Sequence, residues 1–433
     1  MEFEAVTRFA RTLRCYALAA ITVCAVALFF ATPSQAFATP EDFALLADTH
    51  LGQPYKPSYK ETEHALNWAI KFDNLKAVCV AGDLTDRGAS DSYDEWESLC
   101  SSILDGPVHI QALGDHDTGK NGEYLRHFPE LTVARGYANF LKVNGGSTTS
   151  FTQFETANVI TVGGVRANGY RIITKEMLEQ LNSRLQVTAR EGKMAIVVCH
   201  YPYDNSALNM RSKLMGILRS YPNVIYVSGH KHQYSSSKQC QVAKPDCTTT
   251  PFKRVGFSRD TKYSFRSIGV NACSAYRAGN GISYADSLTI KENGQITVQK
   301  WNLTKNLVEK KWVFEQAKST VAVKSVPASK RYPRKNLLEY RITFSDGKAY
   351  GGVNSGETFL LKAGRTKKFS NIPAGVLVTV KQVSAPKGWS KAKSVRVEVG
   401  KKARTLTMKA KYKKPASSSS RRLRATSASG ASI

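Results

Sequence analysis

Aspartate and histidine side chains follow five apolar segments of the sequence, and side chains of these two types bind metals and transfer protons. The five endings are Asp48-Thr49-His50, Gly82-Asp83-Leu84-Thr85-Asp86-Arg87-Gly88, Gly114-Asp115-His116-Asp117, His200 and Gly229-His230-Lys231-His232. One such ending has the ordinary explanation of a strand that ends in water. Five of them predict a shared site at one edge of a sheet, where three carboxylates and four imidazoles could hold two adjacent divalent metals.

The segments around these endings alternate between strand and helix patterns from residue 41 to about 305. We expect strands at 43–47, 75–80, 108–113, 150–154, 159–162, 194–199 and 224–228, and helices at 62–72, 92–104, 175–189 and 208–220. Strands that feed helices predict an α/β core with buried sheets. Ligands of such folds gather in the loops beyond the carboxyl ends of the strands, which is where the five endings fall.

The order of these motifs resembles that of the calcineurin-like metallophosphoesterases. The series of that family runs D-x-H, G-D-x-x-D-[RG], G-N-H-[DE], H and G-H-x-H, and the resemblance covers about residues 41–305. It implies a four-layer α/β/β/α sandwich that hydrolyses phosphate monoesters or diesters. A hydroxide between two metal ions would attack the phosphorus atom in line.

The resemblance also implies a role for each metal ligand. The expected ligands are Asp48, His50 and His232 for the first ion, Asp115, His200 and His230 for the second, and Asp83 as the bridge. Sites made of imidazoles and carboxylates accept manganese, iron or zinc, so the metal stays open. Asp115 stands where the family has Asn, and its carboxylate adds a negative charge beside the second ion.

Three further residues are implied in catalysis. His116 stands at the position of the family's general acid, and Asp117 at that of the carboxylate that orients it. Arg87 has a planar guanidinium that could contact a phosphate oxygen. The alternative for Arg87 is an ion pair with Asp86, a residue that we expect to support its turn.

The N-terminal region is typical of an export signal. Arg8, Arg11 and Arg14 precede an uncharged apolar run at 15–30, and small-x-Ala cleavage options follow at 34–38. We expect cleavage of residues 1–38, with an uncleaved anchor as the alternative. No second stretch approaches 18 apolar residues, so no transmembrane span is expected after cleavage. The predicted location is secreted or associated with the cell surface. In that oxidising compartment, Cys240 and Cys247 are a candidate local disulfide.

Positive charge is concentrated at the C-terminal end. Residues 1–320 hold 36 Lys and Arg against 30 Asp and Glu, whereas residues 321–433 hold 26 against 4. Such a region attracts polyanions. Because export makes nucleic acid a poor default partner, we expect the basic region to bind an anionic cell-wall polymer or lipid. The alternative is a solvated basic spacer.

The C-terminal region also has an organisation of its own. We expect a linker at 316–335, a small all-β sandwich at 336–412 with strands near 338–344, 358–361, 376–383, 394–399 and 405–411, and a disordered tail at 413–433. The run at 362–375, the strand that follows and Ala385-Pro386-Lys387-Gly388-Trp389 are similar to prealbumin-like B-type repeats of surface adhesins and pilins. No covalent sorting motif follows.

The sequence therefore favours an exported phosphoesterase whose domain is expected at 39–315, acting on a phosphate-ester substrate with two divalent ions. The alternative function is a cell-surface binding or adhesion protein whose phosphoesterase domain is inactive. Ligands at all five motifs argue against that alternative, and Asp115 is the feature that argues for it.

Overall fold

The computed structural model describes residues 39–52, 58–118, 133–167, 170–205, 208–232, 252–255, 265–275, 281–329 and 331–414. The export signal, the candidate disulfide of Cys240 and Cys247 and nearly all of the basic tail lie outside these residues. Within these ranges every helix is too short or too polar to span a lipid bilayer.

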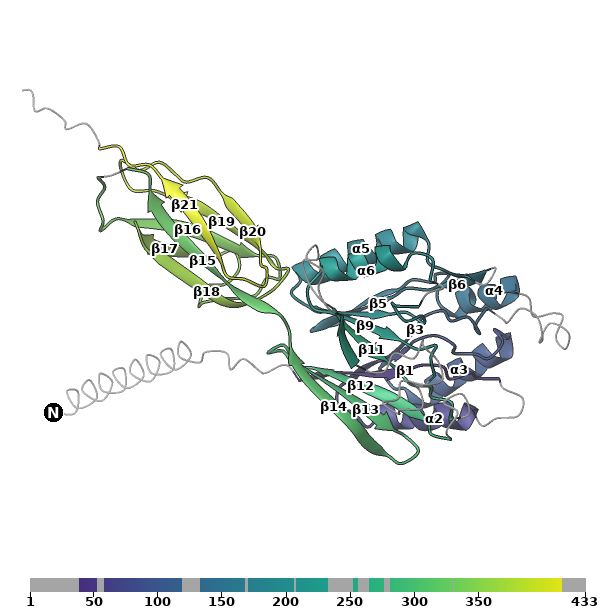
Figure 1. The fold of residues 1–433 in the computed structure, drawn as a ribbon. Coiled ribbons are helices and arrows are strands. Elements are labelled where there is room, and N and C mark those ends of the chain that lie inside the picture. The colour runs from purple at the N-terminus through teal and green to yellow at the C-terminus, as the bar shows by residue number, and fades with distance from the viewer. Residues whose placement is uncertain are drawn as a thin grey trace, which may run out of the picture. The chain divides into compact units, whose positions relative to one another are not determined.

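Two six-stranded sheets form the core of the N-terminal region (Figure 1). The first has the order β14-β13-β12-β1-β2-β3, with β14 (Leu307–Glu315), β13 (Gln295–Asn302), β12 (Tyr284–Ile290), β1 (Glu41–Leu46), β2 (Leu75–Val80) and β3 (Val108–Gln111). The second has the order β10-β11-β9-β8-β5-β4, with β10 (Phe252–Val255), β11 (Phe265–Gly269), β9 (Val224–Ser228), β8 (Met194–Val198), β5 (Ala157–Thr161) and β4 (Phe151–Gln153). The hairpin of β6 (Val165–Ala167) and β7 (Tyr170–Ile172) stands apart from both.

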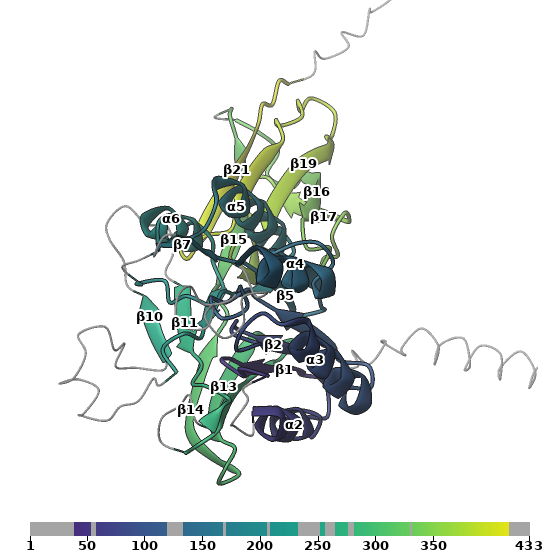
Figure 2. The ribbon, with the colours of Figure 1, turned by 90° about the vertical axis from the view of Figure 1, so that its right-hand side faces the viewer.

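Alternating side chains of each sheet face two different layers. Leu45 of β1 packs between the sheets with Ile196 and Val198 of β8, whereas Leu46 packs on the other face against helices. The helices are α2 (Ser58–Ala69), α3 (Ser90–Ile103) and α4 (Val133–Val143) beside the first sheet, and α5 (Lys175–Arg190) and α6 (Arg211–Ser220) beside the second. Figure 2 shows α2 and α3 on one side of the strands and α5 and α6 on the other. The predicted four-layer α/β/β/α sandwich is confirmed.

The direction of the strands that precede the motifs decides where the chemistry falls. Strands β1, β2 and β3 are parallel neighbours, and so are β5, β8 and β9. Because parallel strands end at the same edge of a sheet, the loops after β1, β2 and β3 leave the first sheet together. Those after β8 and β9 leave the second sheet together. All five sequence motifs therefore start from strand ends.

The C-terminal region is an all-β sandwich with its own hydrophobic core. One sheet has the order β18-β15-β21, made of β18 (Thr366–Pro373), β15 (Lys318–Pro327) and β21 (Arg404–Ala410). The other has the order β17-β16-β19-β20, made of β17 (Thr358–Lys362), β16 (Leu337–Phe344), β19 (Leu377–Ser384) and β20 (Val395–Glu398). The all-β expectation for this region is confirmed.

The linker expected at 316–335 is wrong for half of its length. Residues 318–327 form β15, the central strand of the three-stranded sheet, which pairs with β18 and with β21. Val321 and Val323 enter the core, while Ala322 and Lys324 face outward. The segment was predicted as a linker because it is rich in Lys, Ser and Pro. Only two of its inward-facing residues are strongly apolar, so the strand pattern is weak.

Two buried ionisable residues lie between the two large sheets. Asp286 of β12 stands directly opposite Lys300 of β13, and the two residues are 1% and 4% exposed. Neither carboxylate oxygen of Asp286 has a hydrogen-bond partner among the residues described. Burial raises the pKa of Asp286 to about 7, and the charge of Lys300 opposes this rise. Burial also lowers the pKa of Lys300.

This raised pKa predicts a pH-dependent cost to stability. Folding favours the protonated carboxyl, so its contribution is complete below the unfolded pKa of about 3.9 and is lost as the pH rises to about 7. Relative to the Asp286→Asn variant, the wild-type protein should lose up to about 1.4 kcal/mol of stability per pH unit across this interval. Denaturant unfolding of both proteins in chelator measures the difference. Parallel pH curves would contradict the assignment.

Candidate metal centre

The loops that carry the predicted ligands have an unusual backbone. Asp48, His50, Asp83, His230 and His232 have φ angles of 52°, 50°, 52°, 71° and 57°. The left-handed region costs a residue with a side chain about 1 kcal/mol or more, and such strain collects at functional sites. Hydrogen bonds between loops hold this conformation, since the Asp48 amide donates to Gly82 and the His50 amide donates to Asp83, each at 3.0 Å.

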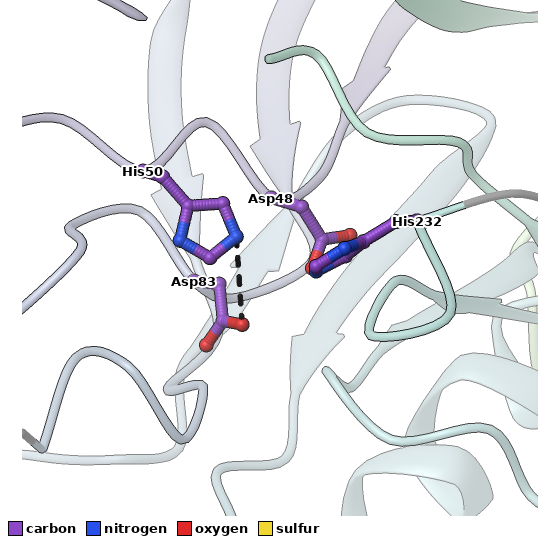
Figure 3. A group of neighbouring side chains, drawn as sticks. All are labelled: Asp48, His50, Asp83 and His232. Carbon is purple, nitrogen blue, oxygen red and sulfur yellow. Dashed lines mark ion pairs between the residues drawn. The ribbon is translucent and has the colours of Figure 1, made fainter. Parts of the chain in front are cut away.

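The first cluster joins the loops after β1, β2 and β9. Asp48, His50, Asp83 and His232 each offer one ligand atom within 4.8 Å of the others. Nε2 of His50 lies 3.9 Å from Oδ2 of Asp83, and Nε2 of His232 lies 3.3 Å from Oδ1 of Asp48. Figure 3 shows these four side chains converging, with Asp48 and His50 coming from the same loop. This is the ligand set expected for the first ion.

The second cluster shares Asp83 with the first. Asp83, Asp115, His200 and His230 again offer atoms within 4.8 Å of one another. Nε2 of His200 lies 3.0 Å from Oδ1 of Asp115 and 3.3 Å from Oδ2 of Asp83, while Nδ1 of His230 lies 3.2 Å from Oδ1 of Asp115. Nδ1 of His200 lies 2.9 Å from the Ala81 carbonyl, so its Nε2 is the nitrogen that faces the carboxylates.

The electrostatics keep the carboxylates of this second cluster charged. Burial alone would raise the pKa of Asp83, but the charges of His200 and His116 leave it below its usual value. Burial would also raise the pKa of Asp115, and hydrogen bonds from His200 and His230 leave it well below its usual value. Burial lowers the pKa of His230. Negative oxygens beside imidazoles are suited to a divalent cation.

The exposure of the ligands indicates where a substrate could enter. Asp48, His50 and His200 are completely buried, whereas the side chains of His230 and His232 are 16% and 26% exposed. The loop after β9 therefore forms the open side of the centre. The seven predicted ligands form two clusters of two carboxylates and two imidazoles each, and this donor set fits two divalent ions.

His116 has a different partner from the one expected. Nδ1 of His116 lies 2.9 Å from the carbonyl oxygen of Asp86 and 3.4 Å from its Oδ1. The carboxylate of Asp117 instead accepts the Thr85 amide at 2.8 Å and the Gly114 amide at 2.9 Å. The expectation that Asp117 orients His116 is therefore corrected: Asp86 holds the imidazole, and Asp117 joins two ligand loops.

Asp86 is the residue whose importance the sequence reasoning missed. Besides His116, its Oδ1 lies 3.4 Å from Nδ1 of His50, and the residue is 2% exposed. Asp86, His50 and His116 form a third group of converging ligand atoms. The sequence signal for this role is the position of Asp86, three residues after Asp83. That spacing places a second carboxylate in the same loop.

Arg87 adopts the alternative contact considered for it. Nη2 donates to the Gly52 carbonyl at 2.7 Å, and Nε lies 4.0 Å from Oδ2 of Asp86. The Arg87 side chain is 14% exposed. These contacts fix the Gly82–Gly88 loop against the loop after β1, and contact of Arg87 with a phosphate oxygen remains a prediction.

Three glycines make the close approach of the loops possible. A Cβ at Gly114 would lie 2.2 Å from the Asp83 amide nitrogen and 2.3 Å from its Oδ1. A Cβ at Gly82 would lie 2.5 Å from Cβ of His200, and one at Gly229 would lie 2.7 Å from Oδ2 of Asp48. Each of these glycines immediately precedes a predicted ligand, so each ligand loop packs directly against another.

We predict that Gly114→Ala destroys the centre. The added methyl group would displace Asp83, so bound metal per chain should fall and the protein should lose about 1–3 kcal/mol of stability. Elemental analysis and thermal unfolding measure both effects. Gly216→Ala in α6 is a matched control, because a Cβ there meets nothing within 4 Å. A Gly114→Ala protein that keeps its metals would show that the loops can separate without cost.

Comparison with known proteins identifies the class of this region. Residues 42–234 match the calcineurin-like phosphoesterase family and form a domain of that family. The resemblance of the five motifs is thereby confirmed, and the domain belongs to a class of metal-dependent phosphoric ester hydrolases. Among curated proteins, none matches the sequence significantly.

Several solved structures are similar to parts of the chain. A purple acid phosphatase from yellow lupin (Lupinus luteus) seeds shares 12% identity with a TM-score of 0.44, over 64% of this chain and 54% of that one. A 5'-nucleotidase precursor from Thermus thermophilus shares 12% identity with a TM-score of 0.35, over 63% and 54%. The major pilin from Streptococcus pyogenes shares 15% identity with a TM-score of 0.20, over 30% and 70%. This chain spans about half the length of the first two.

Proposed function

We propose that this protein is an exported phosphoesterase that hydrolyses phosphate monoesters or diesters with two divalent metal ions. The observation that carries the proposal is the convergence of seven ligands into two clusters that share Asp83. Asp48, His50 and His232 would complete the first site. Asp115, His200 and His230 would complete the second. Bound there, the ions would polarise the phosphoryl oxygens and lower the pKa of an attacking water.

His116 is the proposed proton donor to the leaving alkoxide. Its Nδ1 faces the carbonyl and the carboxylate of Asp86 at 2.9 and 3.4 Å, so Nδ1 carries a proton in the donor role. The transferred proton would then leave from Nε2, and the carboxylate of Asp86 would stabilise the protonated ring. Asp86 is thus a positioning residue in this proposal.

The proposed location is outside the cytoplasm, at the cell surface. Two sequence features support it: the basic and apolar N-terminal segment, and the balance of 26 basic against 4 acidic residues over 321–433. The charge would retain the protein on an anionic polymer or lipid. Retention would keep a secreted enzyme near its phosphate-ester substrate.

Metal content and turnover test the proposed activity together. We expect about two ions per chain, and hydrolysis of p-nitrophenyl phosphate or bis-p-nitrophenyl phosphate when manganese is supplied. Asp83→Asn should bind less metal at both sites and lose activity, because both clusters share this carboxylate. Two bound ions without turnover of either ester would favour the binding or adhesion function. A protein without metal would refute the dinuclear centre.

The role of His116 can be separated from metal binding through the leaving group. His116→Ala should retain its ions and lose about 100-fold to 10,000-fold in kcat on an alkyl phosphate. It should lose much less on p-nitrophenyl phosphate, whose leaving group needs no proton. Asp86→Asn should show the same dependence with a smaller loss. Equal losses on both substrates, or loss of metal in His116→Ala, would contradict a general acid at this position.

Asp115 should be replaceable by Asn. The substitution keeps an oxygen ligand and removes one negative charge from the second cluster, so attraction for an anionic substrate should increase. We expect Asp115→Asn to retain or raise kcat/KM and to bind the second ion more weakly in a metal titration. Complete inactivation would mean that the charge of Asp115 has a role in turnover.

A further inference from the structure

The outer face of the β18-β15-β21 sheet is basic and contains no acid. Along β15, residues with buried side chains alternate with residues turned away from the core, and β21 and the segment 366–370 of β18 follow the same alternation. The outward positions are Thr366, Lys368 and Ser370 of β18, Thr320, Ala322, Lys324 and Val326 of β15, and Thr405, Thr407 and Lys409 of β21. We call these ten positions the lysine face. Its three lysines are all exposed.

The strand register arranges the three lysines in one diagonal row. Lys368 stands opposite Ala322, Lys324 stands opposite Thr407, and Lys409 stands opposite Val326. Each lysine is therefore one strand across and two residues along from the next. With strands about 4.8 Å apart and a rise of about 3.3 Å per residue, the row has a spacing of roughly 8 Å. A single straight row suits a linear partner.

The opposite sheet shows that this arrangement is particular to one face. The outer face of β17-β16-β19-β20 also has exposed cations, Arg341 and Lys381, which stand opposite each other. Glu339 lies on the same strand as Arg341, and Leu360, which is 58% exposed, stands opposite Glu339. A polyanion would meet a carboxylate and a large apolar side chain there, whereas the lysine face presents cations, hydroxyls and the small side chains of Ala322 and Val326.

The composition of the lysine face selects among polyanions. Single-stranded nucleic acid is bound by stacking bases on aromatic side chains, and none of the ten positions is aromatic. Attachment to a lipid surface uses large apolar side chains beside the basic ones, and the apolar residues here are Ala322 and the partly buried Val326. Threonine and serine hydroxyls beside each lysine can donate hydrogen bonds to phosphate oxygens.

We propose that the lysine face binds a linear phosphodiester polymer without bases, with Lys368, Lys324 and Lys409 contacting successive phosphates. This deepens the proposed retention at an anionic surface by naming the face and the class of polymer. It rests on charge and register in the β sandwich and is independent of turnover at the metal centre.

The test measures binding of the full chain to poly(glycerol phosphate) at several salt concentrations. EDTA is present throughout, so that hydrolysis cannot shorten the polymer and a catalytic failure cannot affect the result. The variant is Lys324→Ala/Lys368→Ala/Lys409→Ala. We expect its affinity to fall about tenfold or more at low salt, and the slope of log Kd against log salt to decrease by about 2.

The matched control is Arg341→Ala/Lys362→Ala/Lys381→Ala, which removes the same charge from the other sheet. Lys362 is exposed on the outer face of β17, opposite Leu337 of β16. Its affinity should change less than about threefold, since loss of net charge alone acts weakly at moderate salt. Equal losses of affinity in the two variants would overturn the proposal, because binding would then depend on the total charge and not on the lysine face. Equal loss of binding to phosphatidylglycerol vesicles and to the polymer would overturn the choice of a polymer over a lipid. Unchanged thermal unfolding of both variants confirms that each is folded.

Discussion

The centre depends on one carboxylate that belongs to two ligand sets. Asp83 follows β2, a central strand of the first sheet, and its side chain lies among ligands from both sheets. The carboxylates of Asp48 and Asp115 both lie close to that of Asp83, and the three repel one another unless positive charge lies between them. His200 and His116 supply part of that charge, and bound cations would supply the rest. The two sheets must therefore present their loops at the same edge, which parallel strands do.

The loops pack as closely as the ligands require, at a conformational cost. Five ligands hold left-handed backbone angles, and three glycines allow loops to touch where any side chain would collide. The buried carboxylate of Asp117 connects the loop after β2 to the loop after β3 through the amides of Thr85 and Gly114. Strain and close packing of this kind are stable only because the core strands beneath are rigidly paired.

The sequence predicted the metal centre better than it predicted the details around it. Asp and His at strand ends are distinctive residue types, so the seven residues that converge in the two clusters were all named from the sequence. Strands β2 and β9 were predicted with their observed bounds. The partner of His116 was not predictable from adjacency, because Asp117 follows it in sequence while Asp86 reaches it across a loop. Strand β15 was missed because a half-exposed strand rich in Lys and Ser has the composition of a linker.

The pairing of Asp48 with the loop after β9 links metal binding to the order of folding. The His230 amide donates to the Asp48 carboxylate across 182 positions of sequence. Contacts between residues so far apart in sequence form late in folding. Closing the long loop between them costs entropy before the contact can contribute any stabilisation. A site assembled from both ends of the domain has no counterpart in the unfolded chain. Ions that bind it would select the native state alone, so the supply of metal would govern how long the folded protein persists.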